Sequence, residues 1–91
     1  VIIGDHVKIG PQVGIYTVNH PLDSDERLTG QEYGRTIKLG ENCWIGGHSV
    51  INPGATLGKN VVVASGSVVT KSFGDNVLLA GVPARVIKTL S

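Results

Sequence analysis

The 91-residue sequence has few charges, few aromatic side chains, one cysteine and no methionine. Charged residues make up 16% of the chain and the formal net charge is +1, so the total charge indicates neither a nucleic-acid partner nor a membrane partner. No apolar run approaches the length of a membrane span. A glycine-rich phosphate loop of the P-loop or dinucleotide-binding kind is missing too, so nucleotide binding of those types is not supported.

The single cysteine, Cys43, excludes a disulfide within the chain, which fits a reducing compartment. We therefore expect a cytoplasmic protein. The 41% of apolar residues suit one folded domain over residues 1–91. Position 1 is not methionine and the opening letters VIIG already lie inside the repeat described next, so we expect that an N-terminal segment is missing from this chain.

The sequence contains 13 glycines and a repeat with a period of six residues. A large aliphatic residue leads each hexad, and a small or β-branched residue follows four positions later. Six is not the helical period but is a multiple of two, so both residues fall on the same face of an extended segment. The leaders are Ile3, Ile9, Ile15, Leu39, Ile45, Ile51, Leu57, Val63 and Val69, and their partners are Val7, Val13, Cys43, Ser49, Ala55, Val61 and Ser67.

Each hexad is typical of a very short strand followed by a corner, where Gly, Asn or Asp tolerates a positive φ. Three such edges would close a triangular coil, with the leaders and their partners inside it and parallel hydrogen bonds between successive coils. We therefore predict an all-β parallel solenoid. At the C-terminal end the hexad is lost, and Pro83 at a helix start predicts a short helical cap over residues 83–91 in which Val86, Ile87 and Leu90 cover the open coil.

The repeat is interrupted once, by NHPLDSDERLTGQEYG and the residues around it, 19–36. Leu39 follows Ile15 by a whole number of hexads, so the phase survives the interruption. A loop extruded from one corner of a continuing coil would keep the phase in this way. Because a smooth solenoid has no pocket, we expect this loop to wall off a cleft.

The hexads, the loop beginning with His20 and Pro21, and the segments WIGG, INPGATLG, ASGSVVTK and GVPARVIK resemble the bacterial sugar O-acetyltransferases of the left-handed β-helix superfamily, especially the maltose and galactoside acetyltransferases. The resemblance covers essentially the whole chain. It implies a left-handed coil, a homotrimer with active sites between subunits, and transfer of an acetyl group from acetyl-CoA to a sugar hydroxyl. It implies no metal.

The resemblance implies that His20 is the general base. A neutral imidazole within hydrogen-bond reach can remove the proton of a sugar hydroxyl as it attacks a thioester. Glu32 matches a glutamate in the EYG segment of the maltose-type members, where it would hold the imidazole tautomer or bind the sugar. The alternative for Glu32 is a solvated acid, like Asp23, Asp25 and Glu26 in the same loop.

The resemblance also assigns a site for acetyl-CoA. The backbone N–H at Gly47 would stabilise the tetrahedral intermediate, although Gly46 and Gly47 are equally typical of plain corner glycines. Many members of the family carry serine at the position of Gly47. The other residues at which the family contacts the cofactor are Ser65, Thr70, Lys71, Arg85 and Lys88, and the cations among them suit a polyanionic ligand.

Four other side chains have simpler interpretations. His6 and His48 occupy outward-facing hexad positions and are expected to be surface residues, although His48 could flank the thioester. Trp44 faces outward by phase and would be covered by a subunit or by a ligand. Cys43, at an inward position, is expected to be a core thiol rather than a nucleophile.

Three other functions remain open from the sequence. Serine and antibiotic acceptors compete with sugars within the acetyltransferases, although the HPLD and EYG segments favour the sugar branch. A non-catalytic β-helix assembly subunit would be expected to lack the loop histidine or the basic end, and both are present. A zinc hydratase on the same fold needs three converging histidines, two of them five residues apart, and no such pair occurs among His6, His20 and His48.

Overall fold

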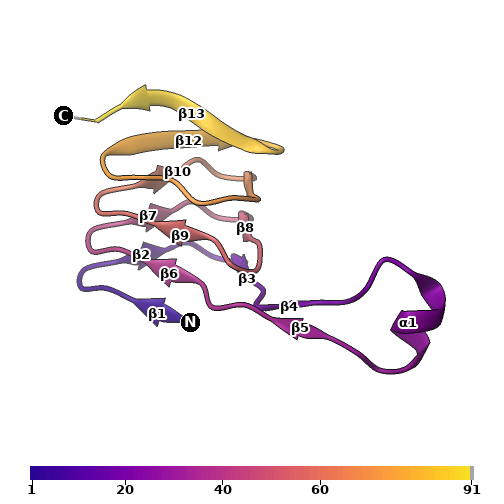
Figure 1. The fold of residues 1–91 in the computed structure, drawn as a ribbon. Helices are drawn as coiled ribbons and strands as arrows, with labels where there is room; N and C mark the ends of the chain where they lie inside the picture. The colour runs from indigo at the N-terminus through magenta and orange to yellow at the C-terminus, as the bar shows by residue number, and fades with distance from the viewer. Residues whose placement is uncertain (91) are drawn as a thin grey trace.

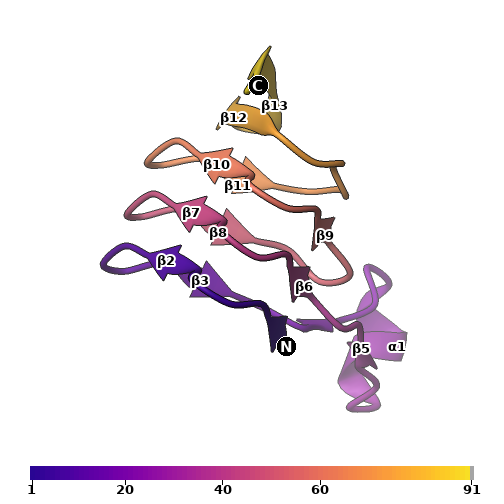
Figure 2. The same cartoon turned by 90° about the vertical axis from the view of Figure 1, so that its left-hand side faces the viewer.

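The computed structural model describes residues 1–90 as a coil of short parallel strands with one arm extending from its side (Figure 1). Turned by 90°, the coils lie in layers one above the other, with the N-terminus at one end of the stack and the C-terminus at the other (Figure 2). The predicted parallel solenoid is therefore confirmed at this level. Most of its strands are only two residues long, as the hexad predicts.

Three sheets form the sides of the coil. The first has the order β1–β6–β9, the second β13–β12–β10–β7–β2 and the third β11–β8–β3. The first sheet contains β1 (Ile2–Ile3), β6 (Lys38–Leu39) and β9 (Thr56–Leu57). The second contains β2 (Lys8–Ile9), β7 (Trp44–Ile45), β10 (Val62–Val63), β12 (Val77–Gly81) and β13 (Ala84–Thr89). The third contains β3 (Gly14–Ile15), β8 (Val50–Ile51) and β11 (Val68–Val69).

Three columns of turns connect the sheets. The first corner, between the first and second sheets, consists of Asp5–His6, Glu41–Asn42, Lys59–Asn60 and Asp75–Asn76. The second corner, between the second and third sheets, consists of Pro11–Gln12, Gly47–His48 and Ser65–Gly66. The third corner, between the third and first sheets, includes Pro53–Gly54, with Lys71 in the following coil. Positive φ recurs at the second residue of these turns, as at Asn60 (54°) and His48 (60°), because this conformation reverses the chain tightly.

The core consists of the hexad leaders and their small partners. From Leu39 onward the leaders are at most 2% exposed, and the partners Cys43, Ser49, Ala55, Val61 and Ser67 are equally buried. Ile3 and Ile9 occupy the same positions in the first coil but are 48% and 42% exposed, because no described residue packs beneath that coil. The predicted inward face is therefore confirmed, and it is left open at the N-terminal end of the stack.

The predicted C-terminal helix is wrong. Residues 84–89 form β13, which pairs antiparallel with β12 after a turn that begins at Gly81 (φ 108°). Val86, Ile87 and Thr89 are β-branched and favour a strand, and this strand adds a final hydrogen-bonded layer to the second sheet. Val86 and Ile87 are 50% and 59% exposed, so Leu79 and Ala84 close the core in their place. Ser91, the last residue of the predicted cap, lies outside the described residues.

The arm spans the residues between the third and first sheets. It begins with β4 (Val18–Asn19), contains α1 (Ser24–Leu28) near its tip and returns through β5 (Tyr33–Gly34), which pairs antiparallel with β4 (Figure 1). Asp23 caps α1 by accepting a hydrogen bond from Glu26 N at 3.0 Å. Within residues 1–90, α1 is the only helix, and no helix there is long and apolar enough to cross a bilayer.

Candidate active site

His20 and Glu32 lie on the two chains of the arm, close to its base. The β4–β5 register pairs Val18 with Gly34 and Asn19 with Tyr33. His20 follows β4 directly and Glu32 precedes β5 directly, so the pairing of the two strands brings these residues to the same level of the arm. Both side chains are exposed, and the described residues contain no ion pair between them. A small molecule could therefore reach the imidazole from the solvent.

The two glycines of WIGG lie where the second sheet enters the second corner. Neighbouring coils approach closely here, since a Cβ on Gly46 would lie 2.6 Å from Ser65 N and 2.7 Å from Val63 O. Gly47 has more room, because its nearest contact would be Pro11 O at 3.2 Å. Gly47 O accepts a hydrogen bond from Gly66 N at 3.0 Å, which fixes the two turns one above the other. The turns that contain Gly47 and Ser65 therefore lie next to each other at the second corner.

The basic residues predicted for the cofactor are distributed over two regions. Arg85 is paired with Ala80 just after the β12–β13 turn, which lies at the second corner because Gly81 N donates to Ser67 Oγ at 3.2 Å. Lys88 is paired with Leu78, further along the same strands. Thr70 and Lys71 follow β11 at the third corner, where the Lys71 ammonium lies 5.5 Å from the centre of the Phe73 ring.

The structure therefore brings together only part of the predicted site in one chain. Gly47, Ser65 and Arg85 lie along the second corner, whereas His20 and Glu32 leave the coil at the third. The third sheet, β3–β8–β11, separates these two groups. On one copy of the chain, the arm that carries His20 and the turn at Gly47 therefore lie at different corners of the coil.

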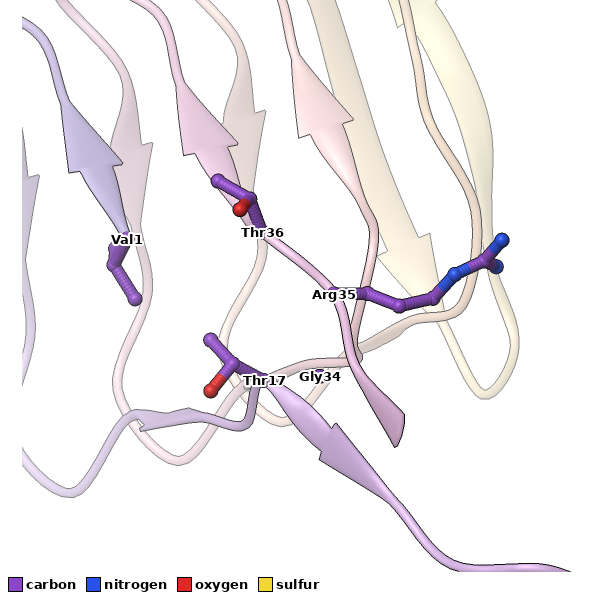
Figure 3. Close-up of a pocket in the computed structure, with 5 residues that line it drawn as sticks. All are labelled: Val1, Thr17, Gly34, Arg35 and Thr36. Carbon is purple, nitrogen blue, oxygen red and sulfur yellow. The ribbon is translucent and has the colours of Figure 1, made fainter. Parts of the chain in front are cut away.

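A cavity of about 220 Å³ lies at the base of the arm (Figure 3). Its lining consists of Val1, Thr17, Gly34, Arg35 and Thr36. The Arg35 side chain points away from Val1 and Thr17 in this view, toward the side of Gly54, whose Cβ would lie 3.3 Å from the Arg35 Cδ. None of the predicted catalytic or cofactor residues lines this cavity.

The three histidines occupy three different places: His6 is at the first corner, His48 at the second and His20 in the arm. Both corner histidines are exposed, as predicted. Within residues 1–90, no group of three His, Cys, Asp or Glu side chains is arranged to hold a metal ion. The histidines of one chain thus do not converge on a common point.

Cys43 is a core residue, 1% exposed, whose Sγ donates to Gly58 O at 3.1 Å. Burial raises the pKa of this thiol above its ordinary value, because the thiolate would lose its hydration. A protonated thiol is a poor nucleophile. The predicted role of Cys43 as a core thiol is therefore confirmed.

Sequence reasoning missed the polar contacts that neighbouring coils make at the corners. Asp75 accepts a hydrogen bond from Lys59 N at 2.8 Å, and Asn60 Nδ2 donates to Asn76 Oδ1 at 3.1 Å. Asn recurs at the second residue of the first corner in three turns out of four, which was the available signal. Trp44 is 56% exposed on the outer face of the second sheet, in register with Lys8 and Val62.

The chain is similar to known proteins that contain hexapeptide repeats. Residues 36–71 match the family described as Bacterial transferase hexapeptide (six repeats). The galactoside O-acetyltransferase of Escherichia coli strain K12 is 47% identical over 91 residues, which are all of this chain and 46% of that protein. The chain thus spans about half the length of this curated relative.

Two solved structures show the same fold. A maltose O-acetyltransferase from Clostridium difficile 630 superposes with a TM-score of 0.96 at 50% identity, covering 99% of this chain and 48% of the other. A galactoside acetyltransferase in complex with coenzyme A superposes with a TM-score of 0.95 at 47% identity, covering 98% of this chain and 44% of the other. Residues 36–71 are therefore similar to the hexapeptide repeats of bacterial transferases, and the chain as a whole is similar to the galactoside and maltose O-acetyltransferases.

Proposed function

We propose that the protein transfers an acetyl group from acetyl-CoA to a sugar hydroxyl of the maltose, glucose or galactoside type, with His20 as the general base. The observation that carries the proposal is the similarity of the whole chain to a galactoside acetyltransferase that was solved with coenzyme A. The exposed imidazole at the base of the arm supports the assignment of the base. The left-handed coil, the single domain over residues 1–91 and the cytoplasmic location stay predictions.

The proposed reaction begins at the sugar hydroxyl. His20 accepts the hydroxyl proton while the oxygen attacks the carbonyl carbon of the acetyl thioester, and the carbonyl π electrons move to its oxygen. The tetrahedral intermediate collapses when the C–S bond breaks, which restores the carbonyl. The imidazolium then returns its proton to the departing thiolate of CoA. Glu32, facing His20 across the arm, is the proposed carboxylate that orients the imidazole.

The separation of the predicted residues supports a site shared between copies of the chain. His20 lies at the third corner and Gly47 at the second, with the third sheet between them. If the second corner of one copy packs beside the third corner of the next, the base meets the oxyanion donor. Contacts of this kind between two different surfaces can close into a ring. The resemblance to the sugar acetyltransferases implies a ring of three copies, and we therefore propose a homotrimer.

Acetyl-CoA would extend from Gly47 toward the C-terminal end of the stack. Ser65 and Arg85 follow Gly47 along the second corner, and Thr70 with Lys71 would reach the same cleft from the third corner of an adjacent copy. Arg85, Lys88 and Lys71 supply cations for the cofactor phosphates. Trp44, exposed beside Gly46, would be covered by the ligand or by the adjacent copy.

The experiment that tests this function is thiol release from acetyl-CoA with a panel of maltose, glucose, a galactoside and serine. Acceptor-dependent release with a sugar, together with a mass increase of the sugar by one acetyl group, is the expected result. Release only with serine would replace the sugar by an amino-acid acceptor. If no acceptor promotes release while the coil remains folded, the proposed reaction is wrong and a non-catalytic role follows.

A further inference from the structure

At the first corner, a backbone N–H of one coil bonds to a carboxylate oxygen of the next coil. Lys59 N–H points out of the turn and donates to Asp75 Oδ1 of the following coil at 2.8 Å. The same carboxylate oxygen lies over Gly58, where a Cβ would collide with it. The absence of a side chain at the glycine therefore leaves room for an oxygen atom between two coils, and the N–H of the next residue binds that oxygen.

The second corner repeats this arrangement with different chemistry. Gly46 and Gly47 correspond to Gly58 and Lys59, and Ser65 takes the place of Asp75. A Cβ on Gly46 would lie 2.9 Å from Ser65 Oγ, so the hydroxyl is over the glycine as the Asp75 carboxylate is over Gly58. Within residues 1–90, neither Gly47 N–H nor the Ser65 hydroxyl has a hydrogen-bond acceptor.

The difference lies in the balance of donors and acceptors. At the first corner a donor meets a carboxylate, which only accepts, and the pair is complete. At the second corner Gly47 N–H is not bonded to the Ser65 hydroxyl, which can donate as well as accept, so within the described residues both the N–H and the O–H lack an acceptor. Such a pair is completed by an oxygen atom from outside the chain, and most strongly by one that carries negative charge.

We propose that the Ser65 hydroxyl is a second oxyanion donor beside Gly47 N–H, and therefore a catalytic residue in its own right. This inference rests on the proposed function. Ser65 Oγ–H would donate to the carbonyl oxygen of the acetyl thioester as the sugar oxygen attacks and the π electrons move onto that oxygen. The hydroxyl proton stays on Ser65, and the hydrogen bond weakens when the C–S bond breaks and the carbonyl re-forms.

The test compares Ser65→Ala, which removes the hydroxyl, with Ser65→Thr, which keeps it. Ser72→Ala is the control, because Ser72 Oγ accepts from Thr56 N at 2.8 Å at the third corner and Ser72 is not among the predicted site residues. Steady-state thiol release with acetyl-CoA and the best sugar gives kcat and KM for each variant. Urea unfolding of the same samples shows whether the coil is intact.

We expect Ser65→Ala to lower kcat at least about tenfold, toward the 10²- to 10³-fold known for a lost oxyanion donor, with the KM for the sugar and the urea midpoint unchanged. Ser65→Thr should recover most of the rate. Ser72→Ala should lower the midpoint and leave kcat unchanged. A Ser65→Ala enzyme within twofold of the parent, or a Ser65→Thr enzyme as slow as Ser65→Ala, overturns the donor role alone. Absence of turnover by the parent overturns the proposed function and this inference with it.

Discussion

The adjacent glycines of WIGG differ in what they tolerate. A Cβ on Gly46 would meet Ser65 N at 2.6 Å and Val63 O at 2.7 Å, both of them backbone atoms of the next coil. Since ordinary contacts are longer by about 1 Å, the two coils must separate or the backbone must twist. We expect Gly46→Ala to cost about 1–3 kcal/mol in the free energy of unfolding, as overpacking does elsewhere.

Gly47→Ala is the matched control. Its Cβ would lie 3.2 Å from Pro11 O, so a shift of a few tenths of an ångström suffices. Gly47 is not among the glycines with positive φ, so alanine also gains about 0.4–1 kcal/mol by restricting the unfolded chain. The two effects nearly cancel, and Gly47→Ala should unfold within about 1 kcal/mol of the parent. Urea unfolding measures both variants, with the m-value as a check on two-state behaviour. Equal losses of stability in the two variants would refute this description of how the coils pack.

Three further predictions concern the stack. Ile45→Ala should lower the free energy of unfolding by about 2–5 kcal/mol because Ile45 is 0% exposed, whereas Ile9→Ala, at the same hexad position but 42% exposed, should lower it roughly half as much. Thermal or urea unfolding measures both variants, and equal losses would contradict the exposure of the first coil. The folded Cys43 thiol should resist alkylation at neutral pH. Because folding raises its pKa, the contribution of the neutral thiol to stability should be fully present below the ordinary thiol pKa of about 8.5 and should decline above it. Cys43→Ala should abolish that decline in a pH series of urea midpoints. Asp75→Ala should cost about 1 kcal/mol by leaving Lys59 N–H without its acceptor, while Asp75→Asn, which keeps an oxygen there, should cost less in the same assay.

The period of six was sufficient to predict which residues form the core. Leu39, Ile45 and Ile51 are buried because a spacing that is a multiple of two keeps them on one face, and no tertiary information was needed. The exposure of Ile3 and Ile9 could not be predicted from that spacing, because it depends on what lies beneath the coil rather than on the residues themselves.

The C-terminal segment shows where local reasoning fails. Pro83 and the apolar residues after it suit a helix start, but β12 offers an unpaired edge that a β-branched segment can complete. Pairing with an existing sheet satisfies the backbone of residues 84–89, so the tertiary context decides the structure. The amino-acid sequence of residues 83–91 does not reveal that such an edge is available.

The structure adds the spatial arrangement of the predicted site residues, which the sequence does not contain. His20 and Glu32 were predicted from a resemblance, but their facing positions follow from the β4–β5 register, which the hexads do not predict. The proposed pair of donors at Gly47 and Ser65 depends on which residues stack between coils. Residues 18 positions apart in this column, such as 47 and 65, become neighbours only once the coil is closed.

The most direct test of the proposed mechanism is the rate of sugar-dependent thiol release by His20→Ala beside that of His6→Ala. Both histidines are exposed, and His6 lies at the first corner, away from the arm. Loss of the general base should lower kcat by about 10²- to 10⁴-fold in His20→Ala, while His6→Ala keeps the rate of the parent. A His20→Ala enzyme as active as His6→Ala would remove His20 from the chemistry and contradict the proposed mechanism.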